Sequence, residues 1–497
     1  MTGEYVGAID QGTTGTRFLV FDAEGQPVSD AFTAHTRRTD RPGGVESDPL
    51  ELWGSATDAI RRGLGGADGG PEDLAALGIA SQRQTVLLWE RATGDPVTPA
   101  VGWQDRRAGD RVTSVDDRTA ALIRERTGLV PDPYFAAPTL AWLLDRGDRR
   151  QRAAAGELCA GTIDSWLVYN LTGRHVTDVT NASQTMLFDI HELAWDDDLR
   201  EAFGVPAPTL PEVRPSSDPG GFGRTDPDGL LSAAVPVAGV LGDQQASLLG
   251  HGGFDAGDAK VTYGSGNFFL QNTGHEPVEG REGLLTTVLH QRAGEVPGYA
   301  LEGPLFTTGA AIEWLERVGL LGDTGRVEGI ARGVDNPGGV VVVPAFDGLG
   351  APDWTPTARS AVFGLTRSTT ADQVVRATLE AIAFGTRAVL EAAEAATGVE
   401  HGRLWIDGGG VYDDDFAQLQ ADLVGRPLAR PAVSQTTALG AAYAAGLAVG
   451  VWDDPAAVRD ANTHDRTFRP TTERDGIEDR YSWWQAATDV VQEFYRP

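Results

Sequence analysis

Cysteine is nearly absent from this 497-residue sequence, which contains only Cys159. A single cysteine excludes an internal disulfide, and the chain shows no cluster of cysteine and histidine that would indicate a zinc site. Cys159 lies in the stretch ELCAGT, where a cysteine usually packs as a small buried hydrophobic residue. The hydrophobic content of 41% is sufficient for sizeable cores.

Long apolar runs are also missing. No run reaches the roughly 18 residues that a membrane-spanning helix requires. The N-terminal residues, MTGEYVGAID, have no basic segment before an apolar one, so the pattern of a secretory signal peptide is not visible. We therefore expect no membrane partner and a cytoplasmic location.

Lysine is as rare as cysteine, because Lys260 is the only one and arginine supplies the other positive charges. The formal net charge is −30. Such a surface argues against nucleic acid as a partner, since phosphate contacts need clustered lysine and arginine. The composition is similar to that of proteins from extreme halophiles. At molar salt the Debye length is about 3 Å and self-repulsion is screened, whereas in dilute buffer it destabilises the compact state.

The length predicts two large lobes rather than one typical domain. We place the first lobe at residues 1–250 and the second at residues 251–497, because each part then contains one turn of the kind that binds phosphate.

The first of these turns lies in Gly7–Asp22, GAIDQGTTGTRFLVFD, which has the pattern of a β-hairpin. Gly12 and Gly15 allow close backbone approach, so the N–H groups and threonine hydroxyls of the turn can surround a phosphate. Asp10 ends the first strand and is a candidate ligand for Mg²⁺, which prefers oxygen. The alternative is an ordinary hairpin with a threonine-rich turn.

The second turn lies in Val261–Leu270, VTYGSGNFFL, again between two apolar runs. Two such turns from two lobes can clamp the two sides of a phosphate. Further along, Thr307, Thr308 and Gly309 stand at the start of a predicted helix, and helix N-termini favour anions. Leu404–Val411 is predicted as a strand that runs into three glycines, which would let an adenine approach the backbone.

Polar and aromatic residues follow predicted strands, which is where α/β folds place ligand sites. Arg83 and Gln84 follow the strand expected at Leu77–Ala80. Trp103, in GWQDRR, is suited to the apolar wall of a polar pocket. A surface turn with an aromatic cap explains Trp103 equally well.

Two further residues stand at turns before predicted helices. A proline-rich turn presents Tyr134, and a helix follows it. Asp243 lies between an apolar strand and a helix that we expect to begin near Gln245. Its alternative role is that of a helix N-cap.

The remaining pattern predicts ordinary framework elements. Hydrophobic spacing indicates helices at Leu50–Leu64 and Ala371–Ala395 and a small-residue helix at Thr437–Val449. Val340–Phe346 has the composition of a buried strand, and Pro206–Asp228 that of a surface loop.

Long stretches spread over nearly the whole chain carry a family resemblance: IDQGTTGTRF, QRQT, WQDRR, DPYF, GDQQAS, TYGSGNFF, EGPLFTTGAAIEWL, VVPAFDGLGAPDW, FGLTRSTTADQVVRATLEAIAFGTR, DGGG and TALGAAYAAGLAVG. Together they resemble the FGGY family of carbohydrate kinases, and within it the glycerol kinases most of all. The resemblance implies an α/β fold of two actin-like (ribonuclease H-like) lobes, as in the sugar kinase, Hsp70 and actin superfamily, with an interlobe cleft.

The resemblance also implies residue roles by position. Asp243 is the implied catalytic base, and Asp10 and Asp243 are the implied ligands of Mg²⁺. The residues implied to hold ATP are Gly12, Thr13, Thr14, Arg17, Ser265, Gly309, Glu313, Gly409 and Asp413, although the spacing after the three glycines is one residue longer here. Those implied to hold the substrate are Arg83, Gln84, Trp103, Tyr134, Asp243, Gln244 and Phe268.

Three positions depart from the glycerol kinase pattern: Gln84 replaces a glutamate, Thr139 a lysine and Gln184 an arginine. Gln84 keeps one acceptor and adds a donor, and we expect it to leave Arg83 without a neighbouring negative charge. A ketose carbonyl or a sugar-acid carboxylate would then suit the pair. The alternative is that Gln84 is a tolerated isostere and the substrate is glycerol.

We therefore expect an ATP-dependent kinase for a small polyol, with glycerol to glycerol 3-phosphate as the first expectation. Another polyol, a ketose or a sugar acid is the alternative substrate. An alternative of another class is an ATP-binding regulator on the same fold, but a regulator would not need the residues of the substrate side. We also expect a homo-oligomer, either a dimer or a tetramer.

Overall fold

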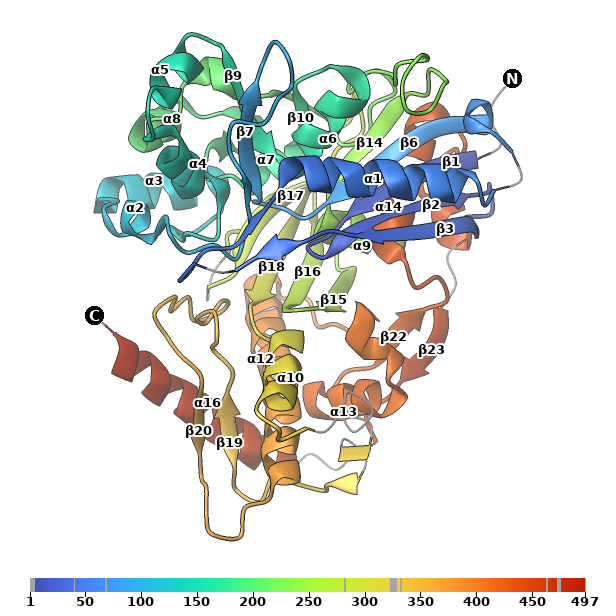
Figure 1. Cartoon of the computed structure of the whole chain (residues 1–497). Helices are drawn as coiled ribbons and strands as arrows, with labels where there is room; N and C mark the ends of the chain where they lie inside the picture. Colours follow the sequence, from blue (N-terminus) through green and yellow to red (C-terminus); the bar gives the residue numbers. More distant parts are fainter. Residues whose placement is uncertain are drawn as a thin grey trace.

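The computed structural model describes residues 5–39, 41–67, 69–280, 283–321, 329–330, 333–461, 464–471 and 475–496. Two mixed β-sheets organise it, and helices cover their faces (Figure 1). No helix in these ranges is both long and apolar enough to cross a membrane.

The first sheet has the strand order β14-β6-β1-β2-β3. Strands β1 and β2 form an antiparallel hairpin, so the hairpin predicted at Gly7–Asp22 is confirmed. The predicted helix α1 (Pro49–Leu64) packs its buried Leu52, Ala56 and Ile60 against this sheet. The strands are β1 (Tyr5–Gln11), β2 (Gly15–Phe21), β3 (Pro27–Ala34), β6 (Leu74–Ser81) and β14 (Val237–Gly242).

The second sheet has the order β17-β18-β16-β15-β21-β22-β23. Strands β15 and β16 form the second predicted hairpin, closed where Tyr263 pairs with Asn267. The strands are β15 (Ala259–Tyr263), β16 (Asn267–Gly274), β17 (Leu285–His290), β18 (Gly298–Leu305), β21 (Leu404–Asp407), β22 (Leu428–Pro431) and β23 (His464–Phe468).

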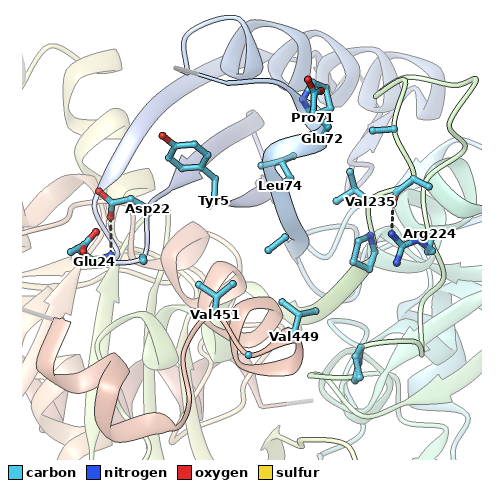
Figure 2. A pocket seen from close by; sticks show the side chains of 17 residues that line it. Tyr5, Asp22, Glu24, Pro71, Glu72, Leu74, Arg224, Val235, Val449 and Val451 are labelled. Atoms are coloured by element: carbon cyan, nitrogen blue, oxygen red, sulfur yellow. Dashed lines mark hydrogen bonds between the residues drawn. The ribbon is translucent and has the colours of Figure 1, made fainter. Parts of the chain in front are cut away.

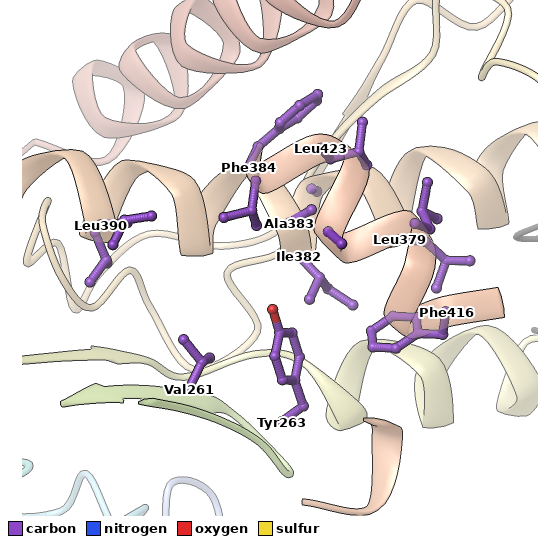
Figure 3. Packing of buried hydrophobic residues seen from close by; sticks show 14 of the residues in the cluster. Val261, Tyr263, Leu379, Ile382, Ala383, Phe384, Leu390, Phe416 and Leu423 are labelled. Atoms are coloured by element: carbon purple, nitrogen blue, oxygen red, sulfur yellow. The ribbon is translucent and has the colours of Figure 1, made fainter. Parts of the chain in front are cut away.

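The long helix α12 (Ala371–Thr397), predicted at Ala371–Ala395, packs beside α13 (Asp414–Val424) and against the second sheet. Figure 3 shows Tyr263 rising from the sheet toward Ile382 of α12, with Phe416 of α13 beside it. This core packs against the base of the second turn, because Tyr263 is the last residue of β15 before the turn.

Two helices lie between the sheets. Helix α14 (Thr436–Val449), predicted from its small residues, contacts β1, β6 and β14, and α9 (Asp243–Gly250) packs along it and also reaches β15 and β16. Small residues are required here, because a Cβ at Gly440 would lie 1.8 Å from the Ala246 carbonyl oxygen. The close contact fixes α9, and therefore Asp243, between the two sheets.

Shorter elements complete the chain. A third sheet has the order β4-β5-β8-β7-β9, and three two-stranded pairs are β10–β13, β11–β12 and β19–β20. The strands are β4 (Arg37–Arg38), β5 (Glu46–Ser47), β7 (Val86–Glu90), β8 (Ala100–Val101), β9 (Leu158–Thr162), β10 (Val176–Asp178), β11 (Phe188–Asp189), β12 (Ala194–Trp195), β13 (Glu212–Arg214), β19 (Val341–Val343) and β20 (Ala361–Phe363). The helices are α2 (Gly109–Thr113), α3 (Asp117–Thr127), α4 (Ala136–Leu144), α5 (Arg149–Ala154), α6 (Ile163–Thr172), α7 (Val179–Ser183), α8 (Asp197–Phe203), α10 (Gly309–Arg317), α15 (Pro455–Ala461) and α16 (Asp475–Tyr495).

Three predicted boundaries need correction. The strand expected at Val340–Phe346 is limited to β19, because only the short strand β20 pairs with it. The helix expected near Gln245 begins two residues earlier, at Asp243. The loop expected at Pro206–Asp228 is not wholly on the surface, since β13 pairs with β10 and Phe222 packs in a hydrophobic core.

Candidate active site

Three strand ends of the first sheet bring the candidate residues together. In the ladder, Gln11 of β1 and Gly242 of β14 both pair with Ser81 of β6. Asp10, the Arg83–Gln84 pair and Asp243 therefore meet at one edge of the sheet. This is the edge at which parallel strands place ligands, and the second sheet approaches it through α9.

Arg83 is held by carboxylates of both lobes. Its Nη1 and Nη2 donate to Glu302 of β18 at 2.7 and 2.6 Å, and its Nε lies 3.2 Å from Asp243 Oδ1. The expectation that Arg83 lacks a neighbouring negative charge is therefore wrong. Burial alone lowers the pKa of Arg83, but Glu302, Tyr134 and Asp243 together keep it above its ordinary value.

Gln84 and Gln184, two of the three departures, are direct partners. Gln84 Nε2 donates to Gln184 Oε1 at 2.6 Å, and Gln184 Nε2 donates to Glu302 Oε2 at 3.0 Å. The third departure, Thr139, is buried in α4. Sequence reasoning missed Glu302, although a glutamate among apolar neighbours in the strand YALEG is a signal that could have found it.

Aromatic rings form one wall beside these polar groups. The rings of Tyr134 and Phe268 lie edge-on to that of Trp103, with centroid distances of 5.8 and 6.0 Å. Trp103 is only 8% exposed, so it is not a cap on a surface turn. Its Nε1 lies 3.4 Å from Thr13 Oγ1, which joins the aromatic wall to the first turn.

Asp243 is the first residue of α9, and the N-cap is Gly242. Its Oδ1 accepts a hydrogen bond from the N–H of Gln244 at 2.7 Å, and its side chain remains 27% exposed. Burial raises the pKa of Asp243, while Arg83 and Lys260 lower it. The result is a carboxylate at a helix N-terminus that is oriented by its neighbours yet still reachable.

Asp10 lies beside two other acids. Burial raises the pKa of Asp10 to about 7, and the negative charges of Asp243 and Asp407 add to the effect. Among the described residues no group of three or more acidic, histidine or cysteine side chains forms a complete metal cage. The two neighbouring carboxylates of Asp10 and Asp243 fit Mg²⁺, which is usually held by one or two carboxylates together with phosphate oxygens and water.

Lys260 also lies at the site, although sequence reasoning noted it only as the sole lysine. It is fully buried in β15, and its Nζ donates to Gln244 Oε1 and, at 2.6 Å, to Thr262 Oγ1. Burial lowers the pKa of Lys260 to about 8, although Asp407 and Asp243 oppose the shift. Its position as the sole lysine, directly before the second turn, was the available signal.

Backbone hydrogen bonds close the two turns. The first is closed by the N–H of Gly12, which donates to the Gly15 carbonyl at 3.0 Å. The second carries the start of α10, since the N–H of Thr308 donates to the Ser265 carbonyl at 2.9 Å. A Cβ at Gly309 would lie 2.8 Å from the carbonyl oxygen of Gly264, so glycine permits this contact.

Two residues implied to bind ATP have other partners. The guanidinium of Arg17 lies 2.6 Å from Asp30 and over the ring of Phe32, although it is close enough to Asp10 to lower the pKa of that carboxyl. Asp413 accepts a hydrogen bond from the N–H of Phe416 at 2.9 Å and so caps α13.

The other implied nucleotide residues lie on accessible backbone. Glu313 is an exposed residue of α10, and Thr14 is exposed in the first turn. Gly409 begins a 3₁₀ turn, and a Cβ built there would meet nothing within 4 Å. The preceding Gly408 has φ 89° and packs on the backbone of Tyr263.

Family models cover both lobes. The N-terminal domain of the FGGY family of carbohydrate kinases matches residues 5–250, and its C-terminal domain matches residues 259–449. The chain belongs to this family.

Individual FGGY kinases match over the full length. Glycerol kinase of Halobacterium salinarum is 51% identical over 98% of each chain, and that of Thermus brockianus is 48% identical over 98% of each. The crystal structure of Plasmodium falciparum glycerol kinase with ADP has a TM-score of 0.88 at 32% identity, covering 98% of each chain. A xylulose kinase from Lactobacillus acidophilus, at 20% identity and TM-score 0.86 over 99% of each chain, shows the fold alone. The predicted fold of two actin-like lobes is confirmed.

A separate cavity of about 1020 Å³ lies at the opposite end of the first sheet of this FGGY kinase. Figure 2 shows its lining, with Tyr5 and Leu74 from the starts of β1 and β6 and Val449 from the end of α14. It contains none of the candidate site residues, which stand at the carboxyl ends of the same strands.

Proposed function

We propose that this chain is an ATP-dependent kinase that converts glycerol to glycerol 3-phosphate. The observation that carries the proposal is the contact between the substrate side and the phosphate side. Trp103, which forms the aromatic wall with Tyr134 and Phe268, also reaches Thr13 of the first turn. A polyol on that wall lies next to a turn suited to hold a phosphate, and the full-length glycerol kinase relatives support the same activity.

Arg83, Gln84 and Asp243 orient the polyol, and Asp243 accepts the proton of the attacking hydroxyl. A carboxylate is a weak base, but the hydroxyl becomes more acidic as the new bond forms, so a late proton transfer suffices. Such a positioned base typically contributes about 10²–10⁴-fold. Gln244 supports the site through Lys260, which binds its side-chain oxygen.

The nucleotide lies between the two turns. Phosphoryl transfer is mainly positioning and charge stabilisation, and the two turns supply both. Asp10 and Asp243 hold Mg²⁺, which neutralises phosphate charge when bound. The residues assigned to ATP are Gly12, Thr13, Thr14, Arg17, Ser265, Gly309, Glu313, Gly409 and Asp413, of which Arg17 and Asp413 must exchange their present partners to take part.

The alternative substrates lose their main support. A ketose or sugar acid was favoured by the idea that Arg83 has no acidic neighbour, yet Glu302 and Asp243 both contact it. These residues therefore do not form a pocket with an unbalanced positive charge, which a carboxylate substrate would require. Glycerol, whose hydroxyls both donate and accept, fits the balanced set better.

The amino-acid composition and the relatives support an assignment of the cellular location. We assign the protein to the cytoplasm of a salt-adapted cell, because its formal charge is −30 and relatives at 50–51% identity come from Halobacterium, Haloferax and Haloquadratum. Residues 1–250 and 251–497 are its two lobes, and it functions as a dimer or tetramer.

Coupled ADP release in molar KCl tests the proposal. The panel contains glycerol, dihydroxyacetone, erythritol and several pentuloses, each with ATP and Mg²⁺. We expect ADP release that depends on glycerol and that exceeds the response to every other compound. ADP release that is independent of any polyol would instead indicate an ATP-binding regulator, and preference for a pentulose would overturn glycerol as the substrate.

A further inference from the structure

The side-chain amides of Gln84 and Gln184 form a buried chain of hydrogen bonds that ends on a carboxylate. Gln84 donates to Gln184 at 2.6 Å, and Gln184 donates to Glu302 at 3.0 Å and to Thr287 Oγ1 at 2.9 Å. Gln184, Thr287 and Glu302 are fully buried and Gln84 is 3% exposed. Water therefore cannot readily replace any link in this chain.

Glu302 determines the direction of every link. An ionised carboxylate only accepts hydrogen bonds, and Glu302 already accepts two from Arg83. Gln184 must therefore turn its NH₂ group toward Glu302 and its carbonyl oxygen toward Gln84. Gln84 must in turn offer its own NH₂ group to Gln184, which leaves Gln84 Oε1 on the far side of the amide.

Gln84 Oε1 is consequently a free acceptor. It accepts no hydrogen bond from the described residues, and it keeps some contact with solvent. The backbone of Gln84 is in the left-handed region at φ 62°, which is unusual for a residue other than glycine. The guanidinium of the preceding residue, Arg83, is 2% exposed and is engaged by Glu302, Asp243 and Gln245, so Gln84 Oε1 is the free group of this pair.

We propose that Gln184 is a positioning residue that holds Gln84 Oε1 toward the substrate, so that the site selects a hydroxyl over a carbonyl at that position. The inference rests on the proposed polyol kinase function. A hydroxyl at that position donates to Gln84 Oε1. A carbonyl only accepts, so it leaves Gln84 Oε1 unpaired, and a site built to bind a donor discriminates against ligands that lack it.

Gln184→Arg tests the orientation, because a guanidinium only donates. The introduced group still donates to Glu302 but demands an acceptor from Gln84, so the Gln84 amide turns over and presents Nε2 to the substrate. We expect kcat/KM for glycerol to fall about tenfold relative to that for dihydroxyacetone, mainly through KM for the polyol. KM for ATP should stay the same. Gln184→Met, which removes the acceptor without adding charge, lowers the same ratio and serves if the arginine variant does not fold.

The double variant Gln84→Glu/Gln184→Arg provides a rescue. A carboxylate accepts in either orientation, and the added guanidinium balances its charge, so the preference for glycerol should return. Gln84→Glu alone should not increase the preference for glycerol, because its carboxylate faces the carbonyl oxygen of Gln184.

Gln245→Leu is the matched control. Gln245 belongs to the same buried network, accepting from Arg83 at 3.3 Å and donating to the Val288 carbonyl at 3.3 Å, and it has no hydrogen bond to Gln84 among the described residues. Gln245→Leu should lower kcat/KM for glycerol and for dihydroxyacetone equally. An unchanged glycerol-to-dihydroxyacetone ratio in folded Gln184→Arg overturns the inference and leaves the kinase function intact. A wild-type protein that turns over neither polyol overturns the proposed function instead.

Discussion

Arg83 and Glu302 form a bidentate ion pair at 2.7 and 2.6 Å although 219 positions separate them in the sequence. Arg83 follows β6 of the first sheet and Glu302 lies in β18 of the second. Both side chains are almost completely buried, with 2% and 1% exposure. The pair therefore links the two lobes and fixes the guanidinium that faces Asp243.

Glu302→Gln should destabilise the fold strongly. The change leaves Arg83 buried with Asp243 as its remaining acidic partner, and breaking a buried ion pair typically costs about 3–5 kcal/mol. We expect a loss near the lower end of that range in the free energy of unfolding, measured by denaturant titration in molar KCl. Glu157→Gln, which breaks the exposed pair with Arg152, should cost at most about 1 kcal/mol. Equal losses in the two variants would contradict a stabilising role for Glu302.

Lys260, together with Arg83, should hold the acidic limb of the pH profile at lower pH. Its positive charge lowers the pKa of Asp243, which burial otherwise raises. Lys260→Met removes that charge, so the pKa of Asp243 rises and the acidic limb of kcat/KM moves to higher pH. Lys260→Arg keeps the charge and should restore most of the wild-type profile. Coincident acidic limbs for the wild type and the methionine variant would show that Lys260 does not act on Asp243.

Asp10 should make stability fall with rising pH when magnesium is absent. Its pKa is about 7 in the folded protein against an ordinary value of 3.8. Between these values the folded state holds a proton that the unfolded chain has released, so the free energy of unfolding decreases as pH rises through this window and stays reduced above pH 7. Asp10→Asn abolishes the effect, and its melting temperature in EDTA should exceed that of the wild type by a few degrees at pH 8.

Wild type and Asp10→Asn also distinguish the effect of Mg²⁺ binding at Asp10 from the effect of its titration. At about pH 3, below the ordinary pKa of 3.8, the unfolded carboxyl is also largely protonated, and their melting temperatures should converge. At pH 8, Mg²⁺ with ATP should raise the melting temperature of the wild type more than that of Asp10→Asn. A wild type that melts higher than the variant in EDTA at pH 8 would show that Asp10 is not destabilised by its neighbours.

Salt should control stability because of the net charge of −30. Removing KCl lengthens the Debye length from about 3 Å at molar salt to 30 Å at 0.01 M, so repulsion between acidic groups extends across the molecule. We expect the melting temperature and the activity to fall together as KCl is removed, and sucrose at equal osmolality not to replace it. A melting temperature that is the same in dilute buffer and in molar KCl would exclude salt adaptation.

Local patterns in the sequence predicted those parts of the structure that form from neighbouring residues. Both hairpins, α1, α12 and α14 follow from apolar spacing and from turns that need glycine, and Asp10, Arg83 and Asp243 follow from their places at strand ends. The boundaries of β19 could not be predicted in this way, because the length of a strand depends on what pairs with it.

Partners that are distant in the sequence carry no local signal. Arg83 has its charge balanced by Glu302, Gln84 meets Gln184, and Lys260 reaches Gln244 only after the two sheets are packed through α9. The sequence therefore indicated which residues are polar at the site but not which of them neutralise one another. A ketose or a sugar acid was considered because Arg83 was expected to lack an acidic neighbour, and that premise was wrong.

The most direct test of the central claim compares wild type and Asp243→Asn for glycerol-dependent ADP release in molar KCl with Mg²⁺. The amide keeps the shape of the side chain but cannot accept the proton of the attacking hydroxyl. We expect kcat to fall about 10²–10⁴-fold, while the affinity for ATP without Mg²⁺, measured by calorimetry, stays within a few fold. Asp255→Asn, on the surface, should behave as wild type. Near-normal turnover by Asp243→Asn, or a wild type whose ADP release does not depend on glycerol, would contradict the account.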